Sequence, residues 1–256
     1  MTLLTIFATL AGAFFLAERL WPRRSQPILR RGVFTDALYI PLQYAFRVAV
    51  GFTAAALLTQ IGRRFFPGRV DLLAGQPIWL QATVVIVTLD FLFYVMHVLK
   101  HRWTWWWRLH ETHHSSEQLD FLASARFHPL EKLLDRVIFL LPLTVMGADE
   151  PALLIWSTMD AFFGMLNHSN VKWRLGKPLI YVFVGPEMHL WHHALDREHR
   201  GSNFGNNLSI FDWVFGTAYV PVESPAAFGI DDRPYPHDNI VRQFLYAFRR
   251  SPSGPA

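Results

Sequence analysis

The stretch HVLKHRWTWWWRLHETHH at residues 97–114 carries five of the twelve histidines of this chain. Its first two, His97 and His101, are four residues apart and share one face of a helix. The last three follow the spacing i, i+3, i+4, which also gathers side chains on one side of a helix. The same H-x2-H-H spacing returns in HLWHH at residues 189–193. These two stretches decide the interpretation of the whole chain.

Clustered histidines beside apolar segments predict metal binding. Uncompensated polar side chains are costly at a membrane boundary, so we expect a ligand to bind them. One zinc ion takes about four ligands. The eight histidines of the two stretches, with His168 as a ninth, exceed that number about twofold, and we therefore expect two metal ions. Imidazole binds zinc, copper, iron and nickel alike, so the ligand type does not identify the metal.

The composition predicts a membrane protein. Of 256 residues, 52% are hydrophobic and only 17% are charged, against the roughly 25% that is usual for soluble domains. The absence of cysteine excludes disulfides, thiolate zinc sites, iron–sulfur clusters and a cysteine nucleophile. The net charge of +4 comes without a basic stripe, so we expect no nucleic-acid partner.

Four apolar stretches approach the roughly 20 residues needed to cross a bilayer. They cover residues 3–17, 37–61, 77–96 and 137–166, and the last is broken at 147–151 (GADEP), where glycine and proline predict a reversal. The fold class we expect is all-α: an integral membrane helical domain with about four transmembrane or re-entrant segments and a cytoplasmic histidine-rich cap.

Arginines orient this domain. Four of them lie within residues 23–31, directly after the first apolar stretch, and by the positive-inside tendency they place its C-terminal end in the cytoplasm. We expect one membrane domain over residues 1–256, with a polar C-terminal tail at 218–256. The location we expect is a bacterial inner membrane with the metal site on the cytoplasmic side, or the ER membrane if the source is eukaryotic.

Two functions are consistent with the clustered histidines taken by themselves. His110-Glu111-x-x-His114 contains the HExxH signature of zinc metalloproteases, in which the glutamate is the general base, so an intramembrane zinc protease is one alternative. The second histidine stretch lacks the glutamate, which argues against a protease. The other alternative is a non-enzymatic membrane metal-binding or transport protein, since histidine-rich segments also bind metals without chemistry.

The histidines also stand in an order typical of a known family. Residues 90–101 read D-x3-Y-x2-H-x3-H, residues 119–131 read LDFLASARFHPLE, residues 167–170 read NHSN, and residues 203–217 read NFGNNLSIFDWVFGT. With the two H-x2-H-H boxes, these segments resemble the fatty acid hydroxylase/sterol desaturase superfamily, the membrane histidine-box di-iron oxygenases. The resemblance covers residues 90–217, which it marks as the catalytic region.

This resemblance implies an enzyme, a membrane-bound non-haem di-iron oxidoreductase of lipid biosynthesis. It would use O2 and external electrons to hydroxylate or desaturate a C–H position of a lipid, whether fatty acyl, sterol or isoprenoid. The implied cofactors are two iron ions, which zinc replaces readily in purified protein. The implied partners are a membrane lipid substrate and a separate electron donor, namely a cytochrome, a ferredoxin or a reductase.

The implied metal ligands are all histidines. They are His97, His101, His110, His113, His114, His168, His189, His192 and His193.

Four further residues are candidates for an extra ligand or for holding a ligand in place: His128, His199, Asp90 and Asn203. Asp90 lies two helical turns before His97, where it could orient an imidazole or pair with an arginine. We expect no catalytic residue beyond the metal ligands. His237 is expected to be an ordinary exposed residue.

Overall fold

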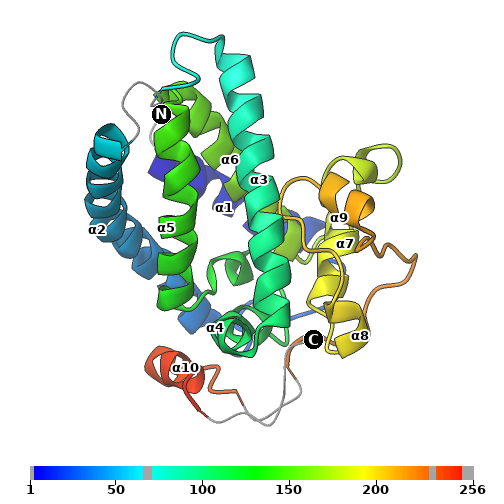
Figure 1. Cartoon of the computed structure of the whole chain (residues 1–256). Coiled ribbons are helices and arrows are strands. Elements are labelled where there is room, and N and C mark those ends of the chain that lie inside the picture. The colour runs from blue at the N-terminus through cyan, green and yellow to red at the C-terminus, as the bar shows by residue number, and fades with distance from the viewer. Residues whose placement is uncertain (1–2, 66–70, 231–234, 250–256) are drawn as a thin grey trace.

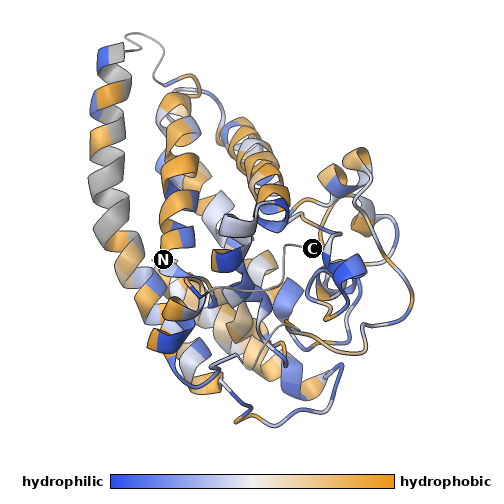
Figure 2. Ribbon diagram, turned by 60° about the horizontal axis from the view of Figure 1, so that its bottom comes forward, coloured by the Kyte–Doolittle hydropathy of each residue, from blue (hydrophilic) through white to orange (hydrophobic). Residues whose placement is uncertain are grey.

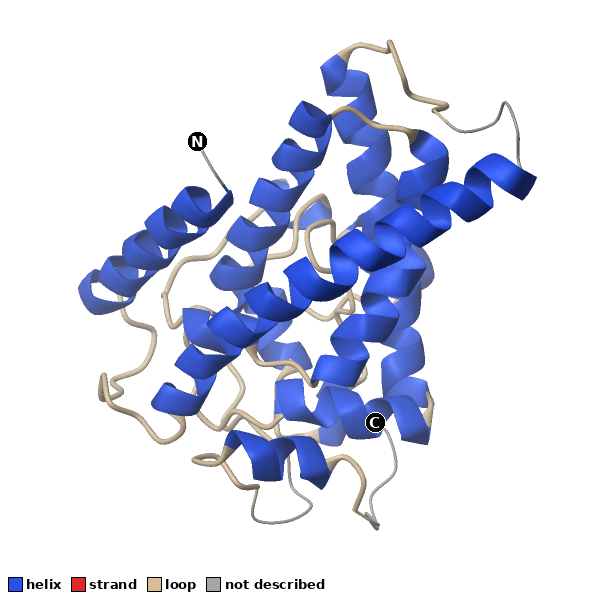
Figure 3. Cartoon of the chain, turned by 90° about the vertical axis from the view of Figure 1, so that its left-hand side faces the viewer, coloured by secondary structure: helices blue, strands red, loops and turns tan. Residues whose placement is uncertain are grey.

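The computed structural model describes residues 3–65, 71–230 and 235–249, with only the backbone described for parts of 47–65. Within these ranges the chain forms helices joined by loops and no strand (Figure 3). The all-α expectation is therefore confirmed. The elements are α1 (Leu3–Leu20), α2 (Val33–Phe65), α3 (Ile78–Arg102), α4 (Thr104–His114), η1 (Phe121–Ala125), α5 (Pro129–Met146), α6 (Glu150–His168), η2 (Leu179–Tyr181), α7 (Pro186–His192), α8 (Arg197–Arg200), α9 (Ile210–Phe215) and α10 (Ile240–Tyr246).

The long helices form a bundle around α3. Helix α3 packs against both α5 and α6, while α2 lies on α5 and α1 lies on α6. The short helix α4 lies across the lower end of α3, with α10 beneath it and α7 to α9 to one side (Figure 1). The histidine stretches are thus carried by the end of α3 and by short helices gathered around it.

The turn between α5 and α6 lies where glycine and proline predict a reversal. Helix α5 ends at Gly147, whose backbone has φ 58° in the left-handed region that favours glycine. A Cβ at this position would lie 2.3 Å from the Cα of Asp71, so the turn has no room for any side chain here. Pro151 then occupies the first turn of α6, a position at which its missing N–H is not needed. This turn returns His168 to the level of the other histidines.

One face of α3 docks the segment 203–217. Asp90 accepts hydrogen bonds from the side chain of Asn207 at 2.8 Å and from the backbone N–H of Leu208 at 2.5 Å. One turn further along the same face, the Tyr94 hydroxyl lies 3.0 Å from that of Thr217. The D-x3-Y-x2-H spacing therefore places two docking residues and His97 on one stripe of the helix.

One helix among the described residues, α3, is long and apolar enough to cross a membrane. Charged side chains interrupt the apolar sequence of the long helices α5 and α6. Helix α5 carries Glu131, Lys132, Asp135 and Arg136 in its first two turns, and α6 carries Asp160. The expectation of about four spanning or re-entrant segments is therefore not confirmed. Which side of a membrane the histidines face stays a prediction.

The outer surfaces of the long helices are nevertheless apolar. Large exposed side chains include Leu16 on α1, Phe34 on α2, Trp79 on α3, Leu141 on α5 and Ile155 on α6. Apart from α2, much of which is grey, the long helices in Figure 2 are largely orange, and blue residues gather around the lower end of the bundle. Exposed apolar surface of this extent is typical of a protein that contacts lipid or another protein.

The segment after residue 217 is not simply a loose polar tail. The Tyr39 hydroxyl of α2 lies 2.8 Å from Oε1 of Gln243 on α10, and both side chains are buried. The expectation for His237 is wrong, because it is buried and lies 3.3 Å from the Glu117 carboxylate. Residues 250–256 lie outside the described part of the chain.

Glu18 ties the first helix to two segments near the histidines. Its Oε1 accepts hydrogen bonds from the backbone N–H of Phe121 at 2.8 Å and of Asn170 at 2.9 Å, and the side chain is buried. We expect Glu18→Ala to lower the free energy of unfolding by about 2 kcal/mol, because two buried N–H groups lose their acceptor. Thermal unfolding in detergent measures this. Glu223→Ala, at an exposed position, is the control, and equal melting of both variants would contradict the assignment.

Candidate metal centre

Nine buried histidines meet at the lower end of the bundle, and they are the nine predicted ligands. The end of α3 supplies two of them, α4 supplies three, the last residue of α6 supplies one, and α7 with the residue that follows it supplies three. Helical spacing explains the local clustering, because side chains three or four residues apart lie on one face. The tertiary fold brings the four elements to one place.

The nine imidazoles divide into two groups, each with its ligand nitrogens within 4.8 Å of one another. The first group contains five: His97, His101, His110, His114 and His192. The second group contains four: His113, His168, His189 and His193. This arrangement has the capacity for two ions, as the histidine count predicts.

Adjacent residues in the sequence belong to different groups. His113 and His114 are neighbours on α4, but the first lies in the group of four and the second in the group of five. His192 and His193 divide in the same way. Successive side chains on a helix point about 100° apart, so an H-H pair suits two nearby sites better than one.

The nitrogen separations match those of ligands around a common ion. His97 Nε2 lies 3.0 Å from His110 Nε2, and His114 Nε2 lies 3.2 Å from the same atom. Metal–imidazole bonds of about 2.0–2.1 Å at angles between octahedral and tetrahedral separate neighbouring nitrogens by about 2.9–3.4 Å. In the second group, His168 Nε2 lies 3.1 Å from Nε2 of both His113 and His189. The residues present therefore fit metal ions.

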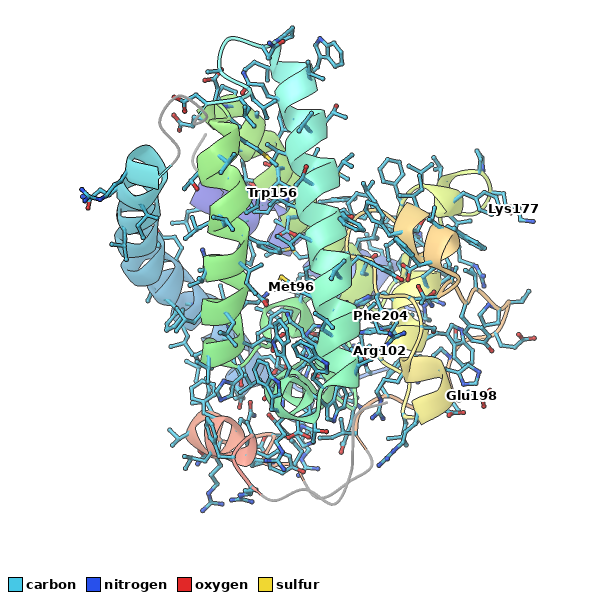
Figure 4. All side chains as sticks on the ribbon, viewed as in Figure 1. Met96, Arg102, Trp156, Lys177, Glu198 and Phe204 are labelled. Carbon is cyan, nitrogen blue, oxygen red and sulfur yellow. The ribbon has the colours of Figure 1, made fainter. Side chains whose placement is uncertain are left out.

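The outward Nδ1 atoms of five of these histidines are held by oxygen atoms. His97 Nδ1 donates to the carbonyl of Phe204 at 2.8 Å, a residue that Figure 4 shows beside α3. The other Nδ1 acceptors at 2.7–3.2 Å are the Glu131 carboxylate for His110 and the carbonyls of Arg126, Gly164 and Ser202 for His113, His168 and His192. A proton fixed on Nδ1 leaves the Nε2 lone pair for a metal.

His192 shows the consequence. Its Nε2 is buried and has no hydrogen-bond partner among the described residues, while its Nδ1 donates to Ser202. A buried nitrogen without a partner is costly unless something binds it. This lone pair belongs to the group of five, where a metal would be its partner.

The electrostatics keep the histidines neutral. Burial, reinforced by the neighbouring imidazoles, holds the pKa of His113, His114 and His193 well below the ordinary value. Neutral imidazole is the form that ligates a metal, so no proton has to be displaced from these side chains at neutral pH.

A buried ion-pair network supports His110. Glu131 on α5 accepts from His110 and also pairs with Lys100 of α3 at 2.8 Å. Lys100 in turn lies 2.8 Å from Asp135. A carboxylate behind a ligating imidazole fixes the ring and raises its basicity. Only tertiary contacts reveal this network, because its members come from separate helices.

Two of the candidate extra ligands lie outside both groups. His128 caps α5: its Nδ1 accepts from the N–H of Leu130 at 3.1 Å, and its Nε2 lies 3.2 Å from the carbonyl of Phe244. His199 packs against the rings of Trp191 and Tyr219, with ring centroids 4.9 and 4.6 Å away. Both histidines therefore have structural contacts that keep them away from the metal groups.

Asp90 and Asn203 hold backbone rather than imidazole. The Asp90 carboxylate accepts its hydrogen bonds from Asn207 and Leu208. It anchors the loop whose Phe204 carbonyl accepts from His97, so it acts on that ligand through the loop. Asn203, with φ 56°, donates to the carbonyls of Met188 and Tyr219 and thereby ties the end of α7 to the following segment.

The tryptophans beside the histidines divide into two kinds. Trp103 and Trp105 are exposed, whereas Trp106 and Trp107 are buried. The Trp107 ring lies 5.0 Å from that of His101 and covers the group of five from one side. In the sequence, only the closeness of Trp107 to predicted ligands indicates this role.

A cavity of about 310 Å³ reaches both groups. Apolar residues from α1 and α6, among them Phe7 and Met165, are part of its lining. His97 and His110 of the first group and His113, His168 and His189 of the second also line it. A molecule in this cavity would therefore lie against both groups at once.

The comparisons with known sequences agree on a family. The sequence model of the fatty acid hydroxylase family matches residues 82–217. An ornithine lipid hydroxylase of Rhizobium tropici is 35% identical over 145 residues, which cover 57% of this chain and 44% of that protein. Human alkylglycerol monooxygenase is 29% identical over 159 residues, covering 62% of this chain and 35% of that protein.

A plant enzyme is similar over the same region. The Delta(7)-sterol-C5(6)-desaturase of Nicotiana tabacum is 27% identical over 151 residues, covering 57% of this chain and 52% of that protein. The chain thus aligns with about half or less of the length of these three relatives. No solved structure matches the chain.

The division into two groups predicts separable metal losses. We expect His114→Ala to weaken binding at the group of five and His193→Ala to weaken binding at the group of four, each lowering the metal content from about two ions per chain toward one. Elemental analysis of detergent-purified protein measures this. His199→Ala is the control, because this histidine belongs to neither group. Loss of metal in the control to the same extent as in the other two would contradict the division.

Proposed function

Because this chain belongs to the fatty acid hydroxylase family, we propose that it is a membrane-bound non-haem di-iron oxidoreductase acting on a lipid. The proposed reaction uses O2 and electrons from a separate donor to hydroxylate or desaturate an aliphatic C–H position. The relatives that match are named as lipid hydroxylases, monooxygenases and desaturases, which supports this class of reaction.

One observation carries the proposal: a single cavity is lined both by apolar side chains and by members of both histidine groups. A lipid chain in this cavity would contact apolar residues such as Phe7 and Met165 as well as the histidines. Apolar walls favour a hydrocarbon chain because they bury its surface from water. The cavity therefore offers a path along which a C–H bond can approach the metal site.

The chain's own residues position everything that reacts. The group of five and the group of four would hold one ion each, with His97, His110 and His192 kept in orientation through their Nδ1 protons. Two bound iron ions would supply the activation of O2 that aliphatic C–H oxidation requires. The apolar side chains of Met165 and Phe127, which line the cavity together with the histidines, would limit the access of water to them. The buried Glu131 accepts a hydrogen bond from Nδ1 of His110 and strengthens that imidazole as a ligand.

The membrane placement is part of the same proposal. Helix α3 would span the bilayer, and α1, α2, α5 and α6 would be embedded beside it, with their exposed apolar side chains toward lipid. The arginines of residues 23–31 lie between α1 and α2, near the histidine end of the bundle, so this end would face the cytoplasm. The proposed location is a bacterial inner membrane.

The zinc protease is the weaker candidate. Both histidines of the HExxH signature belong to the group of five, but Glu111 is not part of either group. A catalytic zinc takes three protein ligands, which would leave six of these nine buried histidines without a metal. The protease also lacks support from the relatives, which are lipid oxidoreductases by name.

We expect His113→Ala and His192→Ala each to abolish the O2-dependent product. One residue comes from each group, and loss of either ion would remove the pair needed for O2 activation. The measurement is lipid mass spectrometry of membranes from expressing cells, which detects a gain of oxygen or a loss of two hydrogens. Both variants should still be present in the membrane fraction. Retained product in both variants would falsify the proposal.

Gly164 tests the cavity separately from the metals. It lines the cavity one turn before His168, and a Cβ there would meet no atom within 4 Å. We expect Gly164→Leu to fold and keep its metal but to lower turnover at least tenfold, because the new side chain fills the space beside the histidines. Elemental analysis and product formation are measured on the same preparation. Gly12→Leu, on α1 and also without close neighbours, is the control.

A further inference from the structure

The cavity has a charged wall that a hydrocarbon chain does not need. Lys132 and Arg136 of α5 line it, together with Asp160 of α6. The two cations are four residues apart and share one face of the helix. Charges placed inside an otherwise apolar site are costly and are typically retained for function. This wall therefore indicates a polar group on the bound molecule.

Lys132 is the less engaged of the two lysines in a local network in which Lys100 and Lys132 face Glu131 and Asp135. Its Nζ makes no hydrogen bond within the described residues, and the nearest carboxylate oxygen, on Asp135, is 3.8 Å away. Both oxygens of Asp135 already lie 2.8 and 2.9 Å from Lys100, which also pairs with Glu131. One lysine thus serves both carboxylates, and the other is left half-buried beside the cavity with its donors available.

The position of this ammonium relates it to the metal site. Lys132 Nζ stands over the ring of Phe127, 3.5 Å from its centroid. His113 stacks on the same ring in nearly parallel orientation with centroids 4.1 Å apart. The positive charge and a member of the group of four therefore contact the same aromatic ring.

Asp160 on α6 gives the cavity its polarity. Its Oδ1 accepts from the Asn206 side chain at 2.8 Å, so this carboxylate is held at the α6 wall. It would repel an anion there and direct it to the α5 wall. The cavity lining has two cations on α5 against this one carboxylate on α6, which favours a bound group with negative charge.

We propose that the cavity binds a lipid through an anionic oxygen group, a carboxylate or a phosphate, held by Lys132 and flanked by Arg136. The reacting C–H would then lie near the polar end of the lipid rather than far along its chain. The statement about the reacting position rests on the proposed function. The binding of the anionic group itself requires no metal.

The test measures lipid binding to the metal-free protein in a neutral detergent. Palmitic acid is compared with methyl palmitate, and a lysophosphatidic acid with the monoacylglycerol of the same chain, by displacement of a fluorescent fatty acid. A charge-assisted hydrogen bond predicts that the charged lipid of at least one pair binds about tenfold more tightly or better. Preference within the first pair identifies a carboxylate, and preference within the second identifies a phosphate headgroup.

The variants assign this preference to one side chain. Lys132→Gln and Lys132→Met should bind charged and neutral lipids equally, and Lys132→Arg should restore the preference. Lys177→Gln is the matched control, because this lysine also stands near an aromatic ring, that of Tyr181, but lies at the outer edge of the molecule (Figure 4). Thermal unfolding of each variant verifies that it is folded.

Two results would overturn the proposal. In the first, the wild-type protein binds the neutral lipid of each pair as tightly as the charged one. In the second, folded Lys132→Gln and Lys132→Met keep the full preference. Neither result concerns oxidation, which the product measurement tests on its own. Charged-lipid binding in a protein that forms no O2-dependent product would refute the proposed function and leave the anion site standing.

Discussion

The rest of the structure depends on nine imidazoles held together out of water. Their inward nitrogens carry lone pairs about 3 Å apart, which repel one another unless a cation lies between them. Much of the fold serves to hold this arrangement from behind. Carbonyls of separate loops accept the outward protons, and Asp90 fixes one of these loops against α3. The bundle is thus a scaffold around two groups of nitrogens whose arrangement fits metal ions.

The sequence predicts the histidines well because their spacing is local. Within each box, residues three or four apart must share a helix face, and the box order identifies the family. The division into five and four is not predictable in this way, because it depends on how α3, α4, α6 and α7 cross. The acceptors behind the rings are also hidden, since a backbone carbonyl such as that of Phe204 carries no signal in its residue type.

Burial is the other property that spacing does not reveal. His237 is surrounded by polar and proline-rich sequence, yet the segment folds back against the lower end of the bundle and buries it. For the charged residues of α5, the sequence shows their presence but not their partners. They are plain in the sequence and weaken the expectation of a spanning segment, but only the tertiary contacts separate Glu131, which pairs within the protein, from Lys132, which faces the cavity.

The two H-H pairs have a mechanical consequence. One peptide bond links the groups at His113–His114 and another at His192–His193, so the spacing between the two groups is set by the backbone of α4 and by that of α7 with the residue that follows it. The long helices that would part to admit a lipid contribute only to one group or the other at their ends. Movement of the long helices can therefore widen the entrance of the cavity while the spacing between the two histidine groups stays constant.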